Sequence, residues 1–167
     1  LFDGLTKHAF ISFDPNYRVD LWKNKVDSFK RKCDSFIEKS HLCKFSLEEA
    51  QLLSGKKDLK EACQVLHEKG TEIIVITLGS EGTWLSTKKF QKTIPSIEVT
   101  PIDTTGAGDA FIGCLLQQIA KHSSIDALLA DESILTNMVA RANKAGAITT
   151  TNFGAIESLP TLQQLDS

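Results

Sequence analysis

The sequence has no long apolar run and no large excess of charge of either sign. Its 19 Lys and Arg residues against 21 Asp and Glu residues give a formal net charge of −2, so the composition does not favour binding to nucleic acid or to an anionic membrane surface. No apolar run approaches the roughly 20 residues that a membrane-spanning helix needs. Residues 1–8 lack the pattern of a secretory signal peptide. These absences predict a cytoplasmic protein with no nucleic-acid partner and no membrane partner.

Cysteine and histidine are sparse, with four of each. The cysteines (Cys33, Cys43, Cys63 and Cys114) include no Cys-x-x-Cys pair, and the histidines form no cluster with the spacing of metal ligands. The sequence therefore predicts reduced thiols that are buried or half-buried, and it favours neither a disulfide framework nor a Cys/His metal centre.

Strand-like and helix-like segments alternate along the 167 residues, with no repeats and no low-complexity linker. The β-branched run at 72–78 is typical of a parallel strand buried on both faces. The order strand, helix, strand predicts an α/β protein with right-handed crossovers, built as one compact unit with a polar tail after Thr161. The expected strands are 9–13, 41–45, 72–78, 83–86 and 90–94, and the expected helices are 24–39, 47–54, 57–69, 110–120, 125–130 and 132–147.

A glycine-rich turn with an acidic residue, Asp103-Thr-Thr-Gly-Ala-Gly-Asp109, precedes the apolar helix at 110–120. Such a turn can direct several backbone N–H groups to one point, where the helix dipole adds partial positive charge. An anion would be stabilised there, beside the carboxylate of Asp109. This combination suits phosphoryl transfer, because the amides hold the transferred group and the carboxylate takes the proton of the attacking hydroxyl. A tight turn with Asp109 as a first-turn acid is the purely structural alternative.

The nine residues from Asp103 to Phe111 resemble the C-terminal signature of the ribokinase family of ATP-dependent carbohydrate kinases, also called the phosphofructokinase-B family. The resemblance implies a ribokinase-like α/β fold with a largely parallel sheet and helices on both faces. It implies Asp109 as the general base, and an anion hole formed by the backbone amides of Gly106, Ala107 and Gly108. It also implies ATP and Mg²⁺ as cofactors, a sugar as the small-molecule substrate, and a homodimer formed through the lid of the intact protein.

The segment Asp14-Pro15-Asn16-Tyr17-Arg18 follows the first expected strand and matches a second family pattern, Asp-Pro-Asn-x-Arg. Ligands bind at the carboxyl ends of strands in open parallel sheets. The resemblance places Asp14 and Asn16 near the nucleotide and makes Arg18 a candidate for holding a phosphate or a polar substrate group. A turn stapled by Asp14 and Asn16, with Arg18 on the surface, is the structural alternative.

Ser46 and Glu49 form a capping-box pattern at the start of the helix at 47–54, and Gly55 can end that helix. The family carries Asn-x-x-Glu here, linked to Mg²⁺ and phosphate handling. Glu49 matches and Ser46 does not, although fructokinase-like members often carry Ser. Glu49 is therefore expected to cap the helix, to hold Mg²⁺ through water, or to do both.

Further residues match the nucleotide and cation sites of the family. Thr77-Leu-Gly79-Ser80-Glu-Gly82 is similar to the nucleotide-lining loop, whose alternative is a plain hairpin connection. Asn143 matches an asparagine beside the adenine, although a helix-surface position would need no function. Asp103, Gly154 and Ser158 match residues that hold a monovalent cation in many members, so K⁺ is a possible further cofactor; an ordinary C-terminal loop is the alternative.

Asp-Pro-Asn-Tyr-Arg-x-x-Leu-Trp at 14–22 is most similar to fructokinase-like members, so fructose is the expected acceptor, with ribose, 2-keto-3-deoxygluconate or a nucleoside as rivals. The chain begins at Leu1, family members are roughly twice as long, and no Gly-Gly signature or lid is visible. We therefore expect the C-terminal portion of such a kinase, as a fragment or as a piece of a longer protein. A non-catalytic nucleotide-binding or interaction module is the alternative from another functional class.

Overall fold

The computed structural model describes residues 9–122 and 124–167, and these form two compact units rather than the one that the sequence suggested. The first, here called the sheet unit, comprises the described residues up to Thr77 together with Trp84–Lys92. The second, the helical unit, comprises Leu78–Thr83 and Thr93–Ser167. No helix among the residues with described structure is long and apolar enough to cross a membrane.

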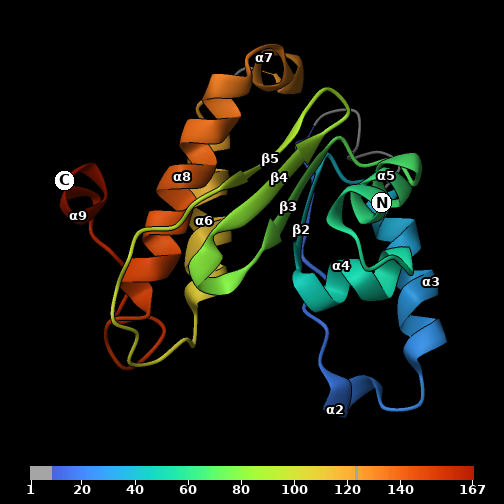
Figure 1. Ribbon diagram of the computed structural model, residues 1–167, viewed down its shortest axis with the longest axis horizontal. Helices are drawn as coiled ribbons and strands as arrows, with labels where there is room; N and C mark the ends of the chain where they lie inside the picture. The colour runs from blue at the N-terminus through green and yellow to red at the C-terminus, as the bar shows by residue number, and fades with distance from the viewer. Residues whose placement is uncertain (1–8, 123) are drawn as a thin grey trace. The chain divides into compact units, whose positions relative to one another are not determined.

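A five-stranded sheet is the centre of the sheet unit, and its strands follow the order of the chain, β1-β2-β3-β4-β5 (Figure 1). β1 pairs with β2, and β2 pairs with β3, both in parallel. The register places Phe13 beside Cys43, and Lys44 beside Val75. The strands are β1 (Ser12–Phe13), β2 (Leu42–Ser46), β3 (Ile73–Thr77), β4 (Thr83–Thr87) and β5 (Gln91–Ile94). The first strand is shorter than the expected 9–13, and the expected strands at 83–86 and 90–94 are present as β4 and β5.

Four helices accompany this sheet: α2 (Val19–Trp22), α3 (Val26–Ile37), α4 (Leu47–Ser54) and α5 (Leu59–Glu68). In α3, the spacing of Phe29, Cys33 and Ile37 at i, i+4 and i+8 puts all three on one buried stripe, as an amphipathic helix requires. The helix α4 begins directly after β2 and ends at Gly55, whose φ of 72° provides the left-handed C-cap that glycine favours. The short α2 was not expected from the sequence.

All four cysteines are free thiols: Cys33, Cys43 and Cys63 are buried and Cys114 is half-buried, as the sequence predicts. Burial raises the pKa of Cys33 and of Cys43 to about 12, so both thiols stay protonated at neutral pH. These side chains therefore act as small apolar residues of the core.

The helical unit contains one 3₁₀ turn, η1 (Gly79–Glu81), and the helices α6 (Ala107–Ile119), α7 (Ile125–Ala130), α8 (Glu132–Thr149) and α9 (Leu162–Asp166). The two long helices α6 and α8 pack against each other. Gly146 of α8 lies against the first turn of α6, where a Cβ atom would sit 3.1 Å from the carbonyl oxygen of Ala107. A glycine at this position of α8 therefore permits the close contact between the two helices.

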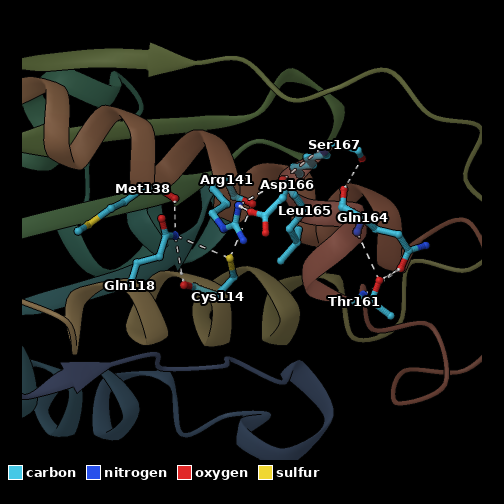
Figure 2. Close-up of polar contacts among 10 residues, drawn as sticks. Cys114, Gln118, Met138, Arg141, Thr161, Gln164, Leu165, Asp166 and Ser167 are labelled. Atoms are coloured by element: carbon cyan, nitrogen blue, oxygen red, sulfur yellow. Dashed lines mark hydrogen bonds and ion pairs between the residues drawn. The ribbon is translucent and has the colours of Figure 1, made fainter.

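Polar side chains tie α6 to α8, and α8 to α9, along one side of this helix pair (Figure 2). The side-chain amide of Gln118 donates to the carbonyl oxygens of Cys114 at 3.2 Å and of Met138 at 3.0 Å. Arg141 donates to the carbonyl oxygen of Leu165 at 3.2 Å and pairs with the carboxylate of Asp166. These contacts fix the C-terminal helix α9, where the sequence predicts only a polar tail.

Candidate active site

The sheet unit brings together four predicted residues, Asp14, Asn16, Arg18 and Glu49, around the segment that leaves β1. Asp14 follows the last residue of β1, at the carboxyl end of that strand. Its Oδ2 atom lies 2.7 Å from Nζ of Lys44 in an ion pair, and its Oδ1 atom is buried with no hydrogen-bond partner. The parallel register explains the pairing. Phe13 lies beside Cys43, so the residues that follow them, Asp14 and Lys44, are also neighbours.

Arg18 ends this segment as the N-cap residue of α2, and it is exposed. Its backbone carbonyl accepts hydrogen bonds from the N–H groups of Leu21 and Trp22, both at 3.1 Å. Nη1 of the guanidinium donates to the carbonyl oxygen of Tyr17 at 3.3 Å. The remaining donors of the planar guanidinium have no acceptor among the described residues, so they can bind a phosphate or a carboxylate. Asn16 has a φ of 49°, a left-handed conformation that asparagine tolerates better than most residues.

Glu49 is buried, with 6% of its surface exposed, and both of its carboxylate oxygens accept backbone hydrogen bonds. Oε2 accepts from the N–H of Ser46 at 2.8 Å, and Ser46 Oγ accepts from the N–H of Glu49 at 3.2 Å, which confirms the predicted capping box. Oε1 accepts from the N–H of Tyr17 at 2.5 Å. Each oxygen keeps further lone pairs, so the carboxylate can still accept a hydrogen bond from a metal-bound water.

In the helical unit, the glycine-rich turn leads into α6 as the sequence predicts, but the helix starts earlier than the expected 110–120. Gly106 is the N-cap residue with a φ of 82°, and Ala107 begins the helix. The N–H of Ala107 makes a long hydrogen bond of 3.3 Å to the carbonyl of Thr104. Within the described parts of the chain, the N–H groups of Gly106 and Gly108 have no such acceptor. Asp109 is exposed in the first helical turn. Open amide donors and a carboxylate therefore share one helix N-terminus.

The predicted cation residues also lie together in the helical unit. Oδ1 of Asp103 accepts from the N–H of Thr105 at 2.9 Å, and Oδ2 accepts from the N–H of Gly154 at 3.3 Å. These hydrogen bonds, first those of Thr105 and then that of Gly154, hold the pKa of the Asp103 carboxyl below its usual range. Ser158 is buried and donates to the carbonyl oxygen of Phe153 at 3.1 Å. Asp103 therefore links the start of the glycine-rich turn to the 153–158 loop.

The predicted nucleotide loop forms the 3₁₀ turn η1, closed by a hydrogen bond of 2.8 Å from the N–H of Leu78 to the carbonyl of Gly82. Gly79 and Ser80 are exposed, and Gly79 has a φ of 62°. A Cβ atom on Gly82 would lie 2.1 Å from the carbonyl oxygen of Ile94, so no other residue fits there. Thr77, at the end of β3 in the sheet unit, donates through Oγ1 to the carbonyl of Phe45 at 3.3 Å.

Asn143 is buried, with 6% exposed, and it is therefore not the helix-surface residue that one interpretation of the sequence proposed. Its amide nitrogen donates to the carbonyl oxygens of Ile94 at 2.9 Å and Pro95 at 3.2 Å. Its amide oxygen accepts from Oγ1 of Thr83 at 2.6 Å. Because both amide hydrogens have protein acceptors, the side chain clamps α8 to Thr83 and to residues 94–95.

Lys44 is the residue that sequence reasoning missed. Its signal is a lysine within a strand whose neighbours Cys43 and Phe45 are fully buried, a place where a charge needs a partner.

Among residues 9–122 and 124–167, no three His, Cys, Asp or Glu side chains form a metal-binding group. A groove on the sheet unit, lined by residues of α5 and of the hairpin turn such as Lys60, Gln64 and Lys88, contains none of the predicted site residues.

The amino-acid sequence resembles those of fructokinases. Fructokinase-1 of Zea mays is 38% identical over 154 residues, which cover 92% of this chain and 46% of that protein. The chain spans about half the length of the curated relatives it matches.

Solved structures of sugar and riboside kinases share the fold. Fructokinase from Vibrio cholerae O395, with fructose, ADP and calcium bound, is 31% identical with a TM-score of 0.87, over 99% of this chain and 52% of that one. A double mutant of the same enzyme, with fructose, ADP and potassium bound, is 30% identical with a TM-score of 0.88 over the same shares. Aminoimidazole riboside kinase from Salmonella enterica, with its riboside and an ATP analog, is 31% identical with a TM-score of 0.85, over 99% of this chain and 55% of that one.

The chain also matches a protein family as a whole. The model for the pfkB family carbohydrate kinases matches residues 2–162, nearly the whole chain. The resemblance carried by the glycine-rich turn is thereby confirmed, and so is the α/β fold with its mixed, largely parallel sheet. The chain belongs to the pfkB family of carbohydrate kinases and has the ribokinase-like fold.

Proposed function

We propose that the protein carrying this chain transfers a phosphoryl group from ATP to a hydroxyl group of a sugar, with fructose as the acceptor. The observation that carries the proposal is the first turn of α6, where Asp109 stands beside the open N–H groups of Gly106 and Gly108. The fructokinases among the relatives, and the fructose and ADP in the Vibrio cholerae enzyme, support fructose as the acceptor.

In this proposal the carboxylate of Asp109 and the backbone amides have different tasks in the same phosphoryl transfer. The acceptor oxygen forms a bond to the γ-phosphorus as the bond from that phosphorus to the departing ADP oxygen breaks. The hydroxyl proton goes to the carboxylate of Asp109, the general base. The amides of Gly106 and Gly108 stabilise the negative charge of the transferred group, and the helix dipole adds to their effect. Ala107 contributes less, because its N–H also contacts Thr104.

Two residues of the sheet unit have supporting roles in the proposal. Arg18 binds a phosphate or a polar substrate group through its open guanidinium donors. Glu49 holds Mg²⁺ through water, using lone pairs that Ser46 and Tyr17 leave available. A bound divalent ion would neutralise phosphate charge, and the calcium in the Vibrio cholerae structure supports a metal site of this kind.

The nucleotide is proposed to lie along the loop at 77–82, where Gly79 and Ser80 expose their backbone. Asn143 contributes indirectly, by fixing the carbonyls of Ile94 and Pro95. Asp14 and Asn16 are proposed to act near the phosphates, because both lie on the segment that leaves the carboxyl end of β1.

A monovalent cation, K⁺, is proposed beside Asp103, Gly154 and Ser158. The carboxylate of Asp103 and its link to the 153–158 loop support this, because K⁺ is held by carboxylate and carbonyl oxygens. The potassium in the Vibrio cholerae double mutant supports it further. On family resemblance alone we also propose a cytoplasmic location and a homodimer; light scattering on the full-length protein tests the homodimer.

A riboside is the second candidate acceptor, because the aminoimidazole riboside kinase structure matches this chain nearly as well as the fructokinase does. The decisive experiment measures ADP release from Mg-ATP with fructose, ribose, 2-keto-3-deoxygluconate, adenosine, aminoimidazole riboside or no acceptor. It uses the full-length protein in which this chain occurs. Fructose-stimulated release supports the proposal, and stimulation by a riboside alone selects the second candidate. ATP binding without stimulation by any acceptor contradicts both and favours a non-catalytic nucleotide-binding module.

A further inference from the structure

The segment that carries Arg18 is held at its start by a charge inside the sheet. Nζ of Lys44 lies 2.7 Å from Oδ2 of Asp14, and the two side chains are only 12% and 20% exposed. The other oxygen of Asp14 has no partner, so among the described residues Lys44 is the one group that offsets this carboxylate. A charge that is largely removed from water is costly unless it is paired. The pair therefore fixes Asp14 to β2.

The same segment is held a second time, three residues later. The carboxylate of Glu49 accepts the N–H of Tyr17 at 2.5 Å while it caps α4. The ring of Tyr17 packs on that of Phe29 in α3, with centroids 4.7 Å apart, and Trp22 packs on the same ring at 5.0 Å. Asp14 and Tyr17, the two residues held in this way, precede Arg18 in the sequence. Trp22, with its aromatic contact, follows Arg18.

We propose that Lys44 is a positioning residue for the phosphoryl transfer: it fixes Asp14 and, through that residue, the path of the backbone that presents Arg18. This inference rests on the proposed function, because it assigns Arg18 a ligand. Lys44 itself touches neither nucleotide nor acceptor in this account. Its charge is used to neutralise Asp14, while the guanidinium of Arg18 stays open at the surface.

A positioning role and a purely structural role of Lys44 predict different effects of its removal once the Arg18 side chain is absent. Loss of Lys44 leaves the Asp14 carboxylate without its counter-charge, so residues 14–18 take up a different position. A displacement of a binding group by about 1 Å can lower a rate by the order of 10²-fold. If Lys44 acts through Arg18, its removal has little further effect once the Arg18 side chain is absent. A general loss of stability would lower activity in both backgrounds.

The experiment is a double-mutant cycle in the full-length protein, with Lys44→Met in the wild-type and Arg18→Ala backgrounds. Lys69→Met is the matched control, because Lys69 also forms an ion pair within the sheet unit, 2.6 Å from Asp34, far along the chain from residues 14–18. The measurements are kcat and KM for ATP and for the acceptor, and hydrogen exchange of the peptide that contains residues 14–18.

We expect Lys44→Met to lower kcat/KM by the order of 10²-fold in the wild-type background and to cause no comparable loss beside Arg18→Ala. We expect faster exchange at 14–18 in Lys44→Met and unchanged exchange there in Lys69→Met. Equal losses in both backgrounds, or unchanged exchange at 14–18, would overturn the inference. If the wild-type protein phosphorylates no acceptor, the proposed function fails, and the exchange comparison still decides whether Lys44 fixes the segment.

Discussion

Gly106 and Ala155 lie so close that a Cβ atom on Gly106 would be 2.7 Å from the Cβ of Ala155 and 3.0 Å from its Cα. The contact joins the N-terminus of α6 to the 153–158 loop, which Asp103 also joins through Gly154. Gly106 in addition has a φ of 82°, where a side chain is disfavoured. The geometry of the proposed anion hole therefore depends on a glycine at this position.

The substitution Gly106→Ala tests this dependence. We expect a loss of stability of about 1–2 kcal/mol from the left-handed conformation alone, and more if the 153–158 loop has to move. We also expect kcat for phosphoryl transfer to fall by more than the loss of stability explains, because the amide N–H groups of the proposed anion hole change direction. Chemical denaturation and kcat give the two quantities.

Gly113→Ala is the control for this prediction. Gly113 lies in the same helix, and a Cβ atom there meets nothing within 4 Å. Alanine should stabilise the helix by about 0.5–1 kcal/mol and leave kcat unchanged. A Gly106→Ala protein as stable and as active as the Gly113→Ala protein would show that the contact with Ala155 is unimportant.

Local signals in the sequence were sufficient for much of the fold. The capping box of Ser46 and Glu49 and the glycine at 55 marked both ends of α4, and the β-branched run at 72–78 gave β3. The nine residues from Asp103 to Phe111 identified a turn that leads into a helix, although α6 begins at Ala107 and not at the expected residue 110. In each case, the residues that determine the structure are adjacent or one helical turn apart.

The features that sequence reasoning missed depend on contacts between distant residues. Lys44 pairs with Asp14 because β1 and β2 run parallel in one register, which a pattern within either strand does not show. Asn143 lies 60 residues from Thr83 along the chain. The helix α9 is short and polar, and although Thr161 and Gln164 form a capping box, Arg141 of α8 holds it in place.

Asn143→Ala should destabilise the protein markedly. The substitution removes the partners of the Ile94 and Pro95 carbonyls and of the Thr83 hydroxyl in a buried place. An unsatisfied buried polar group costs about 1–3 kcal/mol, so a loss in that range or above is expected in chemical denaturation. The matched variant Asn152→Ala removes an exposed side chain and should change stability by less than about 0.5 kcal/mol. Similar values for the two variants would contradict the clamp.

His67 should make stability depend on pH. Its Nδ1 atom lies 2.9 Å from the carbonyl oxygen of Thr71 and therefore carries the proton, so Nε2 accepts from Oγ of Ser86 at 2.8 Å. Burial lowers the pKa of His67 below its ordinary value of 6.5. As the pH falls below about 6.5, the unfolded chain binds the proton first, so the free energy of unfolding declines. Above that pH the contribution of His67 is fully present.

Urea denaturation between pH 8 and pH 5 measures this effect. As the pH falls, we expect the free energy of unfolding to decline less in His67→Gln than in the wild type. The exposed His122→Gln variant should show the wild-type dependence on pH. A His67→Gln protein with the full wild-type decline would show that another group causes it.

Glu49→Gln should weaken two parts of the sheet unit together. Glutamine has one acceptor oxygen, whereas the carboxylate of Glu49 accepts from both Ser46 and Tyr17. Hydrogen bonds to a charged group contribute about 1.5–3 kcal/mol each, so a loss of that size is expected. If Glu49 also holds Mg²⁺ through water, the Mg²⁺ concentration for half-maximal rate should rise. The exposed neighbour Glu48→Gln should change neither quantity; a Glu49→Gln protein that matches it would contradict both roles.

The sharpest test of the proposed mechanism is turnover of the Asp109→Asn variant of the full-length protein, with Mg-ATP and fructose. The control is Asp126→Asn, which changes another exposed acidic residue in a first helical turn, that of α7. We expect Asp109→Asn to bind ATP with nearly unchanged affinity and to lose roughly 10²–10⁴-fold in kcat, because the proton of the acceptor hydroxyl has no base. Asp126→Asn should keep the wild-type rate. Near wild-type turnover in Asp109→Asn would contradict the assignment of Asp109 as the general base, and with it the proposed mechanism.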